Sequence, residues 1–364
     1  MKRSKPEWAP EKDGRGVFAS SVLEGLNELR PRSLESTKTK RQKLSVEEYV
    51  KGVLSGDRSV LARAITLVES NALEDQKAAQ ELLQALLPHS GRSIRIGLSG
   101  IPGAGKSTFI EAFGTLLCEA GHKVAVLAVD PSSSKSKGSI LGDKTRMEKL
   151  SQHPGSFIRP SPSGGVLGGV ARKTRESIVV CEAAGLDIII IETVGVGQSE
   201  ASVRSMVDFF ILLTIAGAGD EMQHIKRGVL ELADAVVVNK ADGENLLAAQ
   251  RTQAELKIAL HYAHGETKEW KPESYLCSAL DGSGISDIWE LIKRFDNCMT
   301  KNGQKERRRK EQLLYWTESL LFEELRQRFL RDAQGQARYE LIKKEVLEER
   351  ISPVAAVDKL MSEY

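Results

Sequence analysis

Apolar residues along this chain follow two patterns that alternate between about residues 94 and 277. Short runs dominated by Ile, Val and Leu are separated by longer segments in which apolar residues recur at helical spacing. Runs that are apolar at nearly every position are typical of strands buried on both faces, as in a parallel sheet covered by helices. The pattern predicts an α/β fold with a central, mostly parallel sheet and strands at 94–98, 123–129, 156–158, 187–191, 209–213, 235–238 and 275–277.

The two ends of the chain carry helical patterns without strands. Ser45 and Glu48 stand at the spacing of a capping box, which predicts a helix beginning there, and helical spacing continues to about residue 90. After about residue 300 the pattern is wholly helical, and Ser352 followed by Pro353 predicts the start of a last helix. The helical end carries an apolar stripe that consists of Trp316, Leu320, Leu321, Leu325 and Phe329.

These patterns divide the chain into four expected parts. Residues 1–43 carry eleven Lys or Arg against six Asp or Glu with little apolar periodicity, which predicts a basic flexible tail. We expect an N-terminal helical domain at 44–90, an α/β domain at 91–298, and a C-terminal helical arm at 299–364.

Composition narrows the class of protein without identifying it. The 364 residues are 41% hydrophobic and 28% charged, as in an ordinary globular protein, and the net charge of +2 gives no reason to expect a nucleic-acid partner. No apolar stretch is long enough to span a membrane, and the first residues contain no apolar core of a secretory signal. The four cysteines lie far apart and mostly in apolar segments, which favours reduced thiols and a cytoplasmic location.

The candidate chemistry begins with the loop after the first predicted strand. Residues 100–107 read GIPGAGKS, which matches the phosphate-binding pattern GxxxxGK[ST] between a strand and a helix. In such a loop the backbone N–H groups and the helix N-terminus surround phosphates, the lysine reaches the β- and γ-phosphates, and the serine hydroxyl binds Mg²⁺. The expected nucleotide contacts are Gly100, Ile101, Pro102, Gly103, Ala104, Gly105, Lys106, Ser107 and Thr108.

A second motif indicates which base is bound. Asn239, Lys240 and Asp242 follow a predicted strand in the pattern NKxD, and Ser278, Ala279 and Leu280 follow the next strand. An Asp carboxylate accepts hydrogen bonds from N1–H and the exocyclic amine of guanine, whereas adenine offers no such pair of donors. The expected ligand is therefore GTP or GDP, with backbone N–H groups of the second segment meeting the guanine carbonyl.

Carboxylates at strand ends are candidates for Mg²⁺ binding and hydrolysis. Asp130 and Glu192 each follow a buried strand, and Glu192 begins ETVG, with Gly195 placed to sense the γ-phosphate. Gln198 either orients the attacking water or caps the next helix, and Asp143 either serves the metal or is a solvated loop residue. The expected Mg²⁺ set is Ser107, Asp130, Asp143 and Glu192, and the expected catalytic set is Lys106, Asp130, Asp143, Glu192 and Gln198.

Together these segments resemble one family, the G-protein chaperones of methylmalonyl-CoA mutase, also called MeaB/ArgK-type GTPases. The strings GSILGDKTRM at 138–147 and ETVGVGQSE at 192–200 carry most of the resemblance, which covers about residues 45–364. The resemblance implies a P-loop GTPase that forms a homodimer through its C-terminal arm. It also implies switch loops at 130–147, 192–200 and 217–228, which would gate adenosylcobalamin loading and protect or reactivate a B₁₂-dependent mutase.

Three other functions fit parts of the sequence. A nucleotide-gated scaffold could bind RNA through Lys305 to Lys310 and the basic tail, but Glu306 breaks that basic run, which favours a solvated helix start. A metal-insertion GTPase of the same class would use a Cys and His cluster, for which only His261 and His264 lie close together. A transport-associated kinase or ATPase is disfavoured because ATP would not satisfy Asp242.

Overall fold

The computed structural model describes residues 43–129, 147–160, 167–193, 199–217, 227–262, 267, 269–331 and 333–362. The chain divides into the segments Met1–Lys43 and Leu44–Tyr364, and the structure below is that of the second segment. The predicted basic tail and most of the first and third predicted switch loops lie outside the described residues.

A seven-stranded parallel sheet forms the centre, in the order β3-β2-β4-β1-β5-β6-β7. All seven predicted strands are confirmed, several with ends moved by one or two residues. Their bounds are β1 Ile94–Gly100, β2 Val124–Val129, β3 Ser156–Arg159, β4 Ile188–Thr193, β5 Phe209–Ile215, β6 Ala235–Asn239 and β7 Glu273–Leu276.

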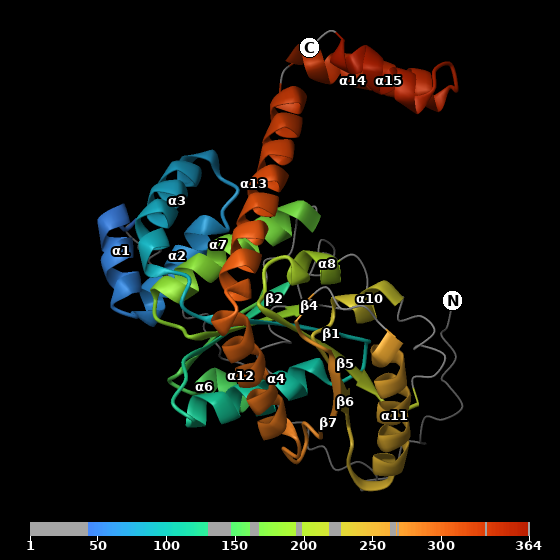
Figure 1. Cartoon of the computed structure of the whole chain (residues 1–364). Coiled ribbons are helices and arrows are strands. Elements are labelled where there is room, and N and C mark those ends of the chain that lie inside the picture. The colour runs from blue at the N-terminus through green and yellow to red at the C-terminus, as the bar shows by residue number, and fades with distance from the viewer. Residues whose placement is uncertain are drawn as a thin grey trace, which may run out of the picture. The chain divides into compact units, whose positions relative to one another are not determined.

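Helices cover both faces of the sheet, as its apolar strands require (Figure 1). One face carries α4 (Lys106–Glu119), α6 (Glu148–Gln152) and α12 (Ile285–Lys301), and the other carries α7 (Leu167–Ala183) and α8 (Ser199–Arg204). The remaining elements of the sheet domain are α10 (Arg227–Leu232), η3 (Gly243–Asn245) and α11 (Leu246–Tyr262).

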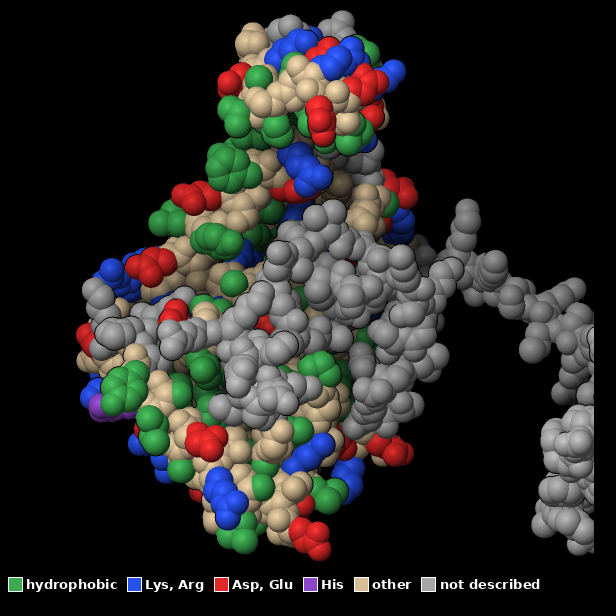
Figure 2. Space-filling view, turned by 90° about the vertical axis from the view of Figure 1, so that its right-hand side faces the viewer, with side chains coloured by type: hydrophobic (Ala, Val, Ile, Leu, Met, Phe, Trp, Pro, Cys, Tyr) green, Lys and Arg blue, Asp and Glu red, His purple; other side chains and the backbone are tan. Residues whose placement is uncertain are grey.

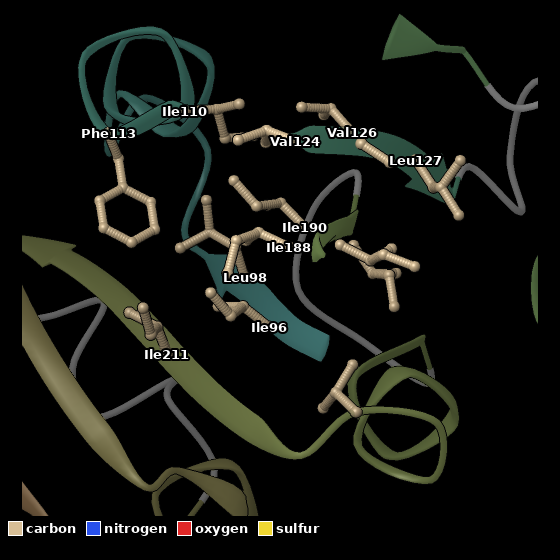
Figure 3. Packing of buried hydrophobic residues seen from close by; sticks show 14 of the residues in the cluster. Ile96, Leu98, Ile110, Phe113, Val124, Val126, Leu127, Ile188, Ile190 and Ile211 are labelled. Atoms are coloured by element: carbon tan, nitrogen blue, oxygen red, sulfur yellow. The ribbon is translucent and has the colours of Figure 1, made fainter. Parts of the chain in front are cut away.

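The core between α4 and the sheet fixes the position of the loop that joins them. Ile110 and Phe113 of α4 point toward strand residues that include Leu98, Val124 and Ile188 (Figure 3). All five side chains are at most 1% exposed. Because a close-packed core tolerates little displacement, β1 and α4 hold the two ends of the 100–106 loop at a fixed separation.

The N-terminal helices α1 (Val46–Leu54), α2 (Arg58–Val68) and α3 (Leu73–Leu86), with η1 (Leu87–His89), pack on α7. The predicted capping box is present, because Ser45 Oγ accepts from Glu48 N at 3.2 Å and Glu48 Oε2 accepts from Ser45 N at 2.7 Å. Arg159 of β3 pairs with Glu69 directly after α2, which ties this layer to the edge of the sheet.

The C-terminal helices are α13 (Gln304–Arg331), α14 (Ala333–Leu347) and α15 (Pro353–Met361). The predicted start of the last helix is confirmed, since Ser352 Oγ accepts from Ala355 N at 3.2 Å and Pro353 occupies the first turn. Hydrophobic side chains lie at the surface of these helices (Figure 2). They include Leu314, Tyr315, Leu321, Phe322 and Leu325, each 48–69% exposed. Among the described residues, no helix combines the length and apolar character that crossing a membrane requires.

Candidate nucleotide-binding site

The parallel sheet brings the predicted site residues to one edge. Because all seven strands run the same way, their carboxyl ends face the same side, where open α/β sheets bind ligands. The loop from Gly100 to Lys106 follows β1, Glu192 lies at the end of β4, Asn239 ends β6, and Ser278 comes just after β7. Loops that are more than 170 residues apart in sequence, from 100 to 278, therefore border one site.

Glycines in the phosphate loop are required by its geometry. Gly103 and Gly105 have φ of 79° and 85°, in the left-handed region that favours glycine. A Cβ on Gly100 would lie 2.3 Å from the carbonyl oxygen of Leu213 on β5, and a Cβ on Gly105 would lie 2.8 Å from Nδ2 of Asn239. Gly105 precedes α4 without a side-chain cap, so the first N–H groups of that helix face the loop.

Lys106 is partly buried and lies near two acidic side chains. Its Nζ donates to the carbonyl oxygens of Gly100 at 2.7 Å and Ile101 at 3.3 Å. Burial lowers the pKa of Lys106, and the negative charges of Glu192 and Glu200 partly oppose that shift. The lysine is therefore held inside the loop, close enough to Glu192 and Glu200 for their charges to act on it.

The end of β4 is joined to the end of β1 by buried polar groups. Glu192 is 7% exposed, and its Cα pairs in register with that of Leu98. Thr193 Oγ1 donates to Ser99 Oγ at 2.9 Å. These contacts place a buried carboxylate beside the phosphate loop, where the sequence predicts one.

Asn239 connects the phosphate loop to the predicted base-binding loop. Its Nδ2 donates to the carbonyl oxygen of Ala104 at 2.8 Å, and its Oδ1 accepts from Ala279 N at 3.0 Å. The Cys277 thiol approaches the same Oδ1 at 3.4 Å. The side chain is 1% exposed, so its amide is a buried bridge between the two loops.

The two base-side segments also contact each other directly. Ser278 Oγ donates to Asp242 Oδ2 at 2.6 Å, which orients the carboxylate predicted to recognise guanine. Lys240 adopts φ of 59°, unusual for a residue other than glycine, which marks a sharp turn directly after β6. Two of the three backbone N–H groups predicted to meet guanine are already bonded within the protein. Ser278 N donates to Ser283 O and Ala279 N donates to Asn239 Oδ1, whereas Leu280 is 84% exposed.

The remaining predicted residues divide into two groups. Ser107 and Thr108 lie in the first turn of α4, as expected from the motif. Asp130, Asp143, Gly195 and Gln198 lie outside the described residues, as does His264. Among the residues that are described, no group of three or more His, Cys, Asp or Glu side chains is arranged to hold a metal ion.

Sequence reasoning missed two features of the site. Glu200, in the first turn of α8, is 1% exposed and acts on Lys106 through its charge, although it lies eight residues after Glu192. The bridging role of Asn239 was also missed, because the motif gives its position but not the partner of its amide. The sequence does show that Asn239 is a polar residue at the end of an otherwise apolar strand, which indicates a buried polar contact there.

Comparison with known proteins identifies the family. The model of the family described as "Methylmalonyl Co-A mutase-associated GTPase MeaB" matches residues 61–334. A putative GTPase of Caulobacter vibrioides is 49% identical over 88% of this chain and 98% of its own length. The mouse protein named methylmalonic aciduria type A homolog, mitochondrial, is 45% identical over 88% of this chain and 79% of its own.

Two further relatives carry other names. GTPase ArgK of Escherichia coli is 47% identical over 77% of this chain and 85% of its own length. The crystal structure of a protein named LAO/AO transport system kinase superposes with a TM-score of 0.72 at 38% identity and covers 87% of this chain and 96% of its own. The phosphate loop, the base-side loops and these matches lead to one assignment: the chain belongs to the MeaB family of P-loop GTPases, which bind and hydrolyse GTP.

Proposed function

We propose that the edge of the sheet described above binds GTP with Lys106 and the loop 100–108 at the phosphates and Asp242 at the guanine. The observation that carries this assignment is the double hydrogen bond of Asn239, to Ala104 and to Ala279. It fixes the spacing between the phosphate loop and the base-side loop, and GTP bound as proposed would span both. With Ser278 N–H and Ala279 N–H already engaged within the protein, the guanine carbonyl would share the Ala279 N–H or use that of Leu280.

Hydrolysis is proposed to depend on Mg²⁺ held by oxygen ligands. Ser107 and the buried Glu192 offer the hard oxygen donors that this ion prefers, and they border the same loop. Asp130 and Asp143 remain candidate ligands on the strength of the sequence, with Gly195 near the γ-phosphate and Gln198 near the water. The ion would neutralise charge that develops on the phosphates, while Lys106 and the loop N–H groups orient them.

The cellular role is proposed to be that of a mutase chaperone. Support comes from the family's description and from the mouse relative's name, which refers to methylmalonic aciduria. In this role, bound GTP orders the loops around 130–147, 192–200 and 217–228, and a B₁₂-dependent methylmalonyl-CoA mutase or related mutase recognises that state. The exchange of GTP for GDP would then gate adenosylcobalamin loading and mutase protection.

We further propose a homodimer formed by the C-terminal helices, in a reducing compartment such as the cytoplasm. Leu314, Leu321 and Leu325 of α13 repeat at intervals of seven and four residues and are 48–66% exposed, as expected of a helix face that a partner covers. The four cysteines at 118, 181, 277 and 298 are free, which suits a reducing environment. Neither a nucleic acid nor a membrane is part of the proposal.

The alternative of a transport-associated kinase or ATPase has one supporting observation, the name of the 38% identical protein of known structure.

One experiment separates the mutase chaperone from the transport-associated kinase or ATPase. GTP and ATP turnover would be measured with and without a B₁₂-dependent methylmalonyl-CoA mutase, together with co-elution of the two proteins loaded with GDP or a non-hydrolysable GTP analogue. We expect the mutase to stimulate GTP turnover and to co-elute in a nucleotide-dependent manner, with Lys106→Ala as the inactive control. ATP turnover that is faster than GTP turnover and does not change when the mutase is added would contradict the proposal.

A further inference from the structure

A cavity lies at the edge of the sheet opposite the proposed nucleotide site. Its volume is about 500 Å³, within the range of small-molecule pockets. Its lining residues come from α7, from α13 and from the residues that lead into β1 and β5. The two helices α7 and α13 contact each other (Figure 1). Since β1 is seven residues long and each residue advances about 3.3 Å, this cavity lies roughly 20 Å from the phosphate loop.

Three buried polar atoms of residues that line the cavity have no hydrogen-bond partner in the part of the chain that the structure describes. They are Arg175 Nε on α7, and Gln312 Oε1 and Trp316 Nε1 on α13. A buried polar atom without a partner destabilises the fold, and three such atoms on residues around one cavity favour a ligand that pairs with them. Gln312 Nε2 donates to Val207 O at 2.8 Å, which fixes the amide with its oxygen as the remaining acceptor.

Arg175 gives the cavity its electrostatic character. The residue is only 8% exposed, and its guanidinium stacks on Tyr315 and Trp316 with its Cζ 5.5 and 5.8 Å from the ring centroids. Its polar contacts are Nη2 bonds to the Ser205 hydroxyl at 2.6 Å and the Ser205 carbonyl at 3.2 Å, and no described carboxylate pairs with it. Burial lowers the pKa of Arg175 to about 10, as expected for a cation that lacks an anionic partner.

Three other cations around the cavity are paired with carboxylates, which distinguishes Arg175 from them. Arg95 pairs with Glu182 at 2.8 Å and Arg309 pairs with Asp208 at 2.6 Å. Lys305 pairs with Asp296. Lys310 and Glu306 line the exposed part of the cavity and oppose each other in charge.

We propose that this cavity binds a small organic anion, a carboxylate or a phosphate joined to a planar or apolar body that also carries one N–H or O–H group. Arg175 Nε and Trp316 Nε1 would donate to the anionic or another acceptor group, and Gln312 Oε1 would accept from the ligand's donor. Ile178, Val179 and Met206 supply apolar walls for the body of the molecule. The ligand would supply the negative charge that Arg175 lacks, which water alone cannot do.

The test uses the full chain saturated with GDP and Mg²⁺, so that the phosphate loop is occupied. Three probes of similar shape are compared: 4-aminobenzoate, 4-aminophenyl phosphate and the neutral 4-aminobenzamide. The chain has four tryptophans, so their indole N–H signals can be followed by ¹H–¹⁵N NMR and that of Trp316 assigned with Trp316→Phe. We expect at least one of the two anions to shift the Trp316 signal at a concentration at least tenfold below the concentration of the amide that does so. The anion that binds with the lower Kd shows whether the cavity prefers a carboxylate or a phosphate.

Matched variants link binding to Arg175. Arg175→Gln should weaken binding of the preferred anion at least tenfold, whereas Arg172→Gln, one turn earlier on α7 and paired with Glu176, should leave it unchanged. If Arg175→Gln does not fold, Arg175→Lys keeps the charge and should retain the preference for anions with reduced affinity.

Three results would overturn the inference. They are equal binding of the amide and the anions, no response of Trp316 to any probe at millimolar concentration, and a Trp316 signal that moves with protein concentration instead. The last result would show that a second copy of this chain fills the cavity.

Discussion

Replacing Asn239 by alanine tests whether one amide holds the nucleotide site together. The side chain is 1% exposed and bridges Ala104 O at 2.8 Å and Ala279 N at 3.0 Å. The substitution leaves a buried acceptor in the phosphate loop and a buried donor in the base-side loop. At about 1–3 kcal/mol for each unpaired group, the free energy of unfolding should fall by about 2–6 kcal/mol.

The assay is thermal unfolding of the nucleotide-free protein, followed by titration with GDP. A loss of about 3 kcal/mol lowers the Tm of a mid-sized domain by about 6–12 °C, because each kcal/mol corresponds to roughly 2–4 °C. The Kd for GDP should rise at least tenfold, since the two loops lose their fixed spacing. Asn245→Ala is the matched control, because Asn245 lies in η3 close to the base-side loop and is exposed. A Tm within about 1 °C of the wild type together with an unchanged Kd for GDP would refute the bridging role.

Four further predictions each test a single residue. Lys106→Ala should abolish detectable GTP binding in calorimetry while leaving the Tm of the free protein within a few degrees, and measurable GTP turnover would contradict its phosphate role. Gly105→Ala should lower both the Tm and the affinity for GDP, because the new Cβ would lie 2.8 Å from Asn239 Nδ2. The control Gly121→Ala should lower the Tm only, because Gly121 has φ of 91° but no atom lies within 4 Å of its added Cβ. Leu321→Glu should convert a dimer to a monomer in light scattering, whereas Leu247→Glu on α11 should not; equal effects would argue against the arm as the interface. Burial alone would raise the pKa of Asp208, but its bonds to Arg309 hold the pKa below 3.8, so its contribution to stability is present above pH 3.8 and lost as the pH falls through the folded-state pKa. The difference in unfolding free energy between wild type and Asp208→Asn should accordingly shrink in acid, and a difference that grows there would show that the sign is wrong.

The sequence predicted the sheet well because its strands are buried on both faces. The four isoleucines at 188–191 form a run without a polar face, and the structure places all seven predicted strands in one parallel sheet. Strand ends were less well defined. Ser99 and Gly100 extend β1 because backbone pairing with β5 continues to Leu213, which no side-chain pattern reveals.

The candidate site was predictable where chemistry fixes residue type and spacing. GxxxxGKS and NKxD specify backbone turns and charged groups, so the sequence alone makes Lys106 and Asp242 candidates for the phosphate and guanine contacts. Contacts between distant segments were not predictable, such as the bridge from Asn239 to Ala104 and the charge of Glu200 near Lys106. The cavity at Arg175 carries no motif, because its polar atoms come together only when α13 packs on α7.

Nucleotide affinities show whether the Asp242 carboxylate selects guanine. Dissociation constants of GDP, ADP and xanthosine diphosphate would be measured for the wild type and for Asp242→Asn. We expect the wild type to prefer GDP over ADP by at least about 10²-fold, since a site built to pair with a donor group rejects ligands that lack it. Asp242→Asn should lose affinity for GDP and gain affinity for xanthosine diphosphate. A wild type that binds ADP as tightly as GDP, or an Asp242→Asn variant that still selects GDP, would contradict the account.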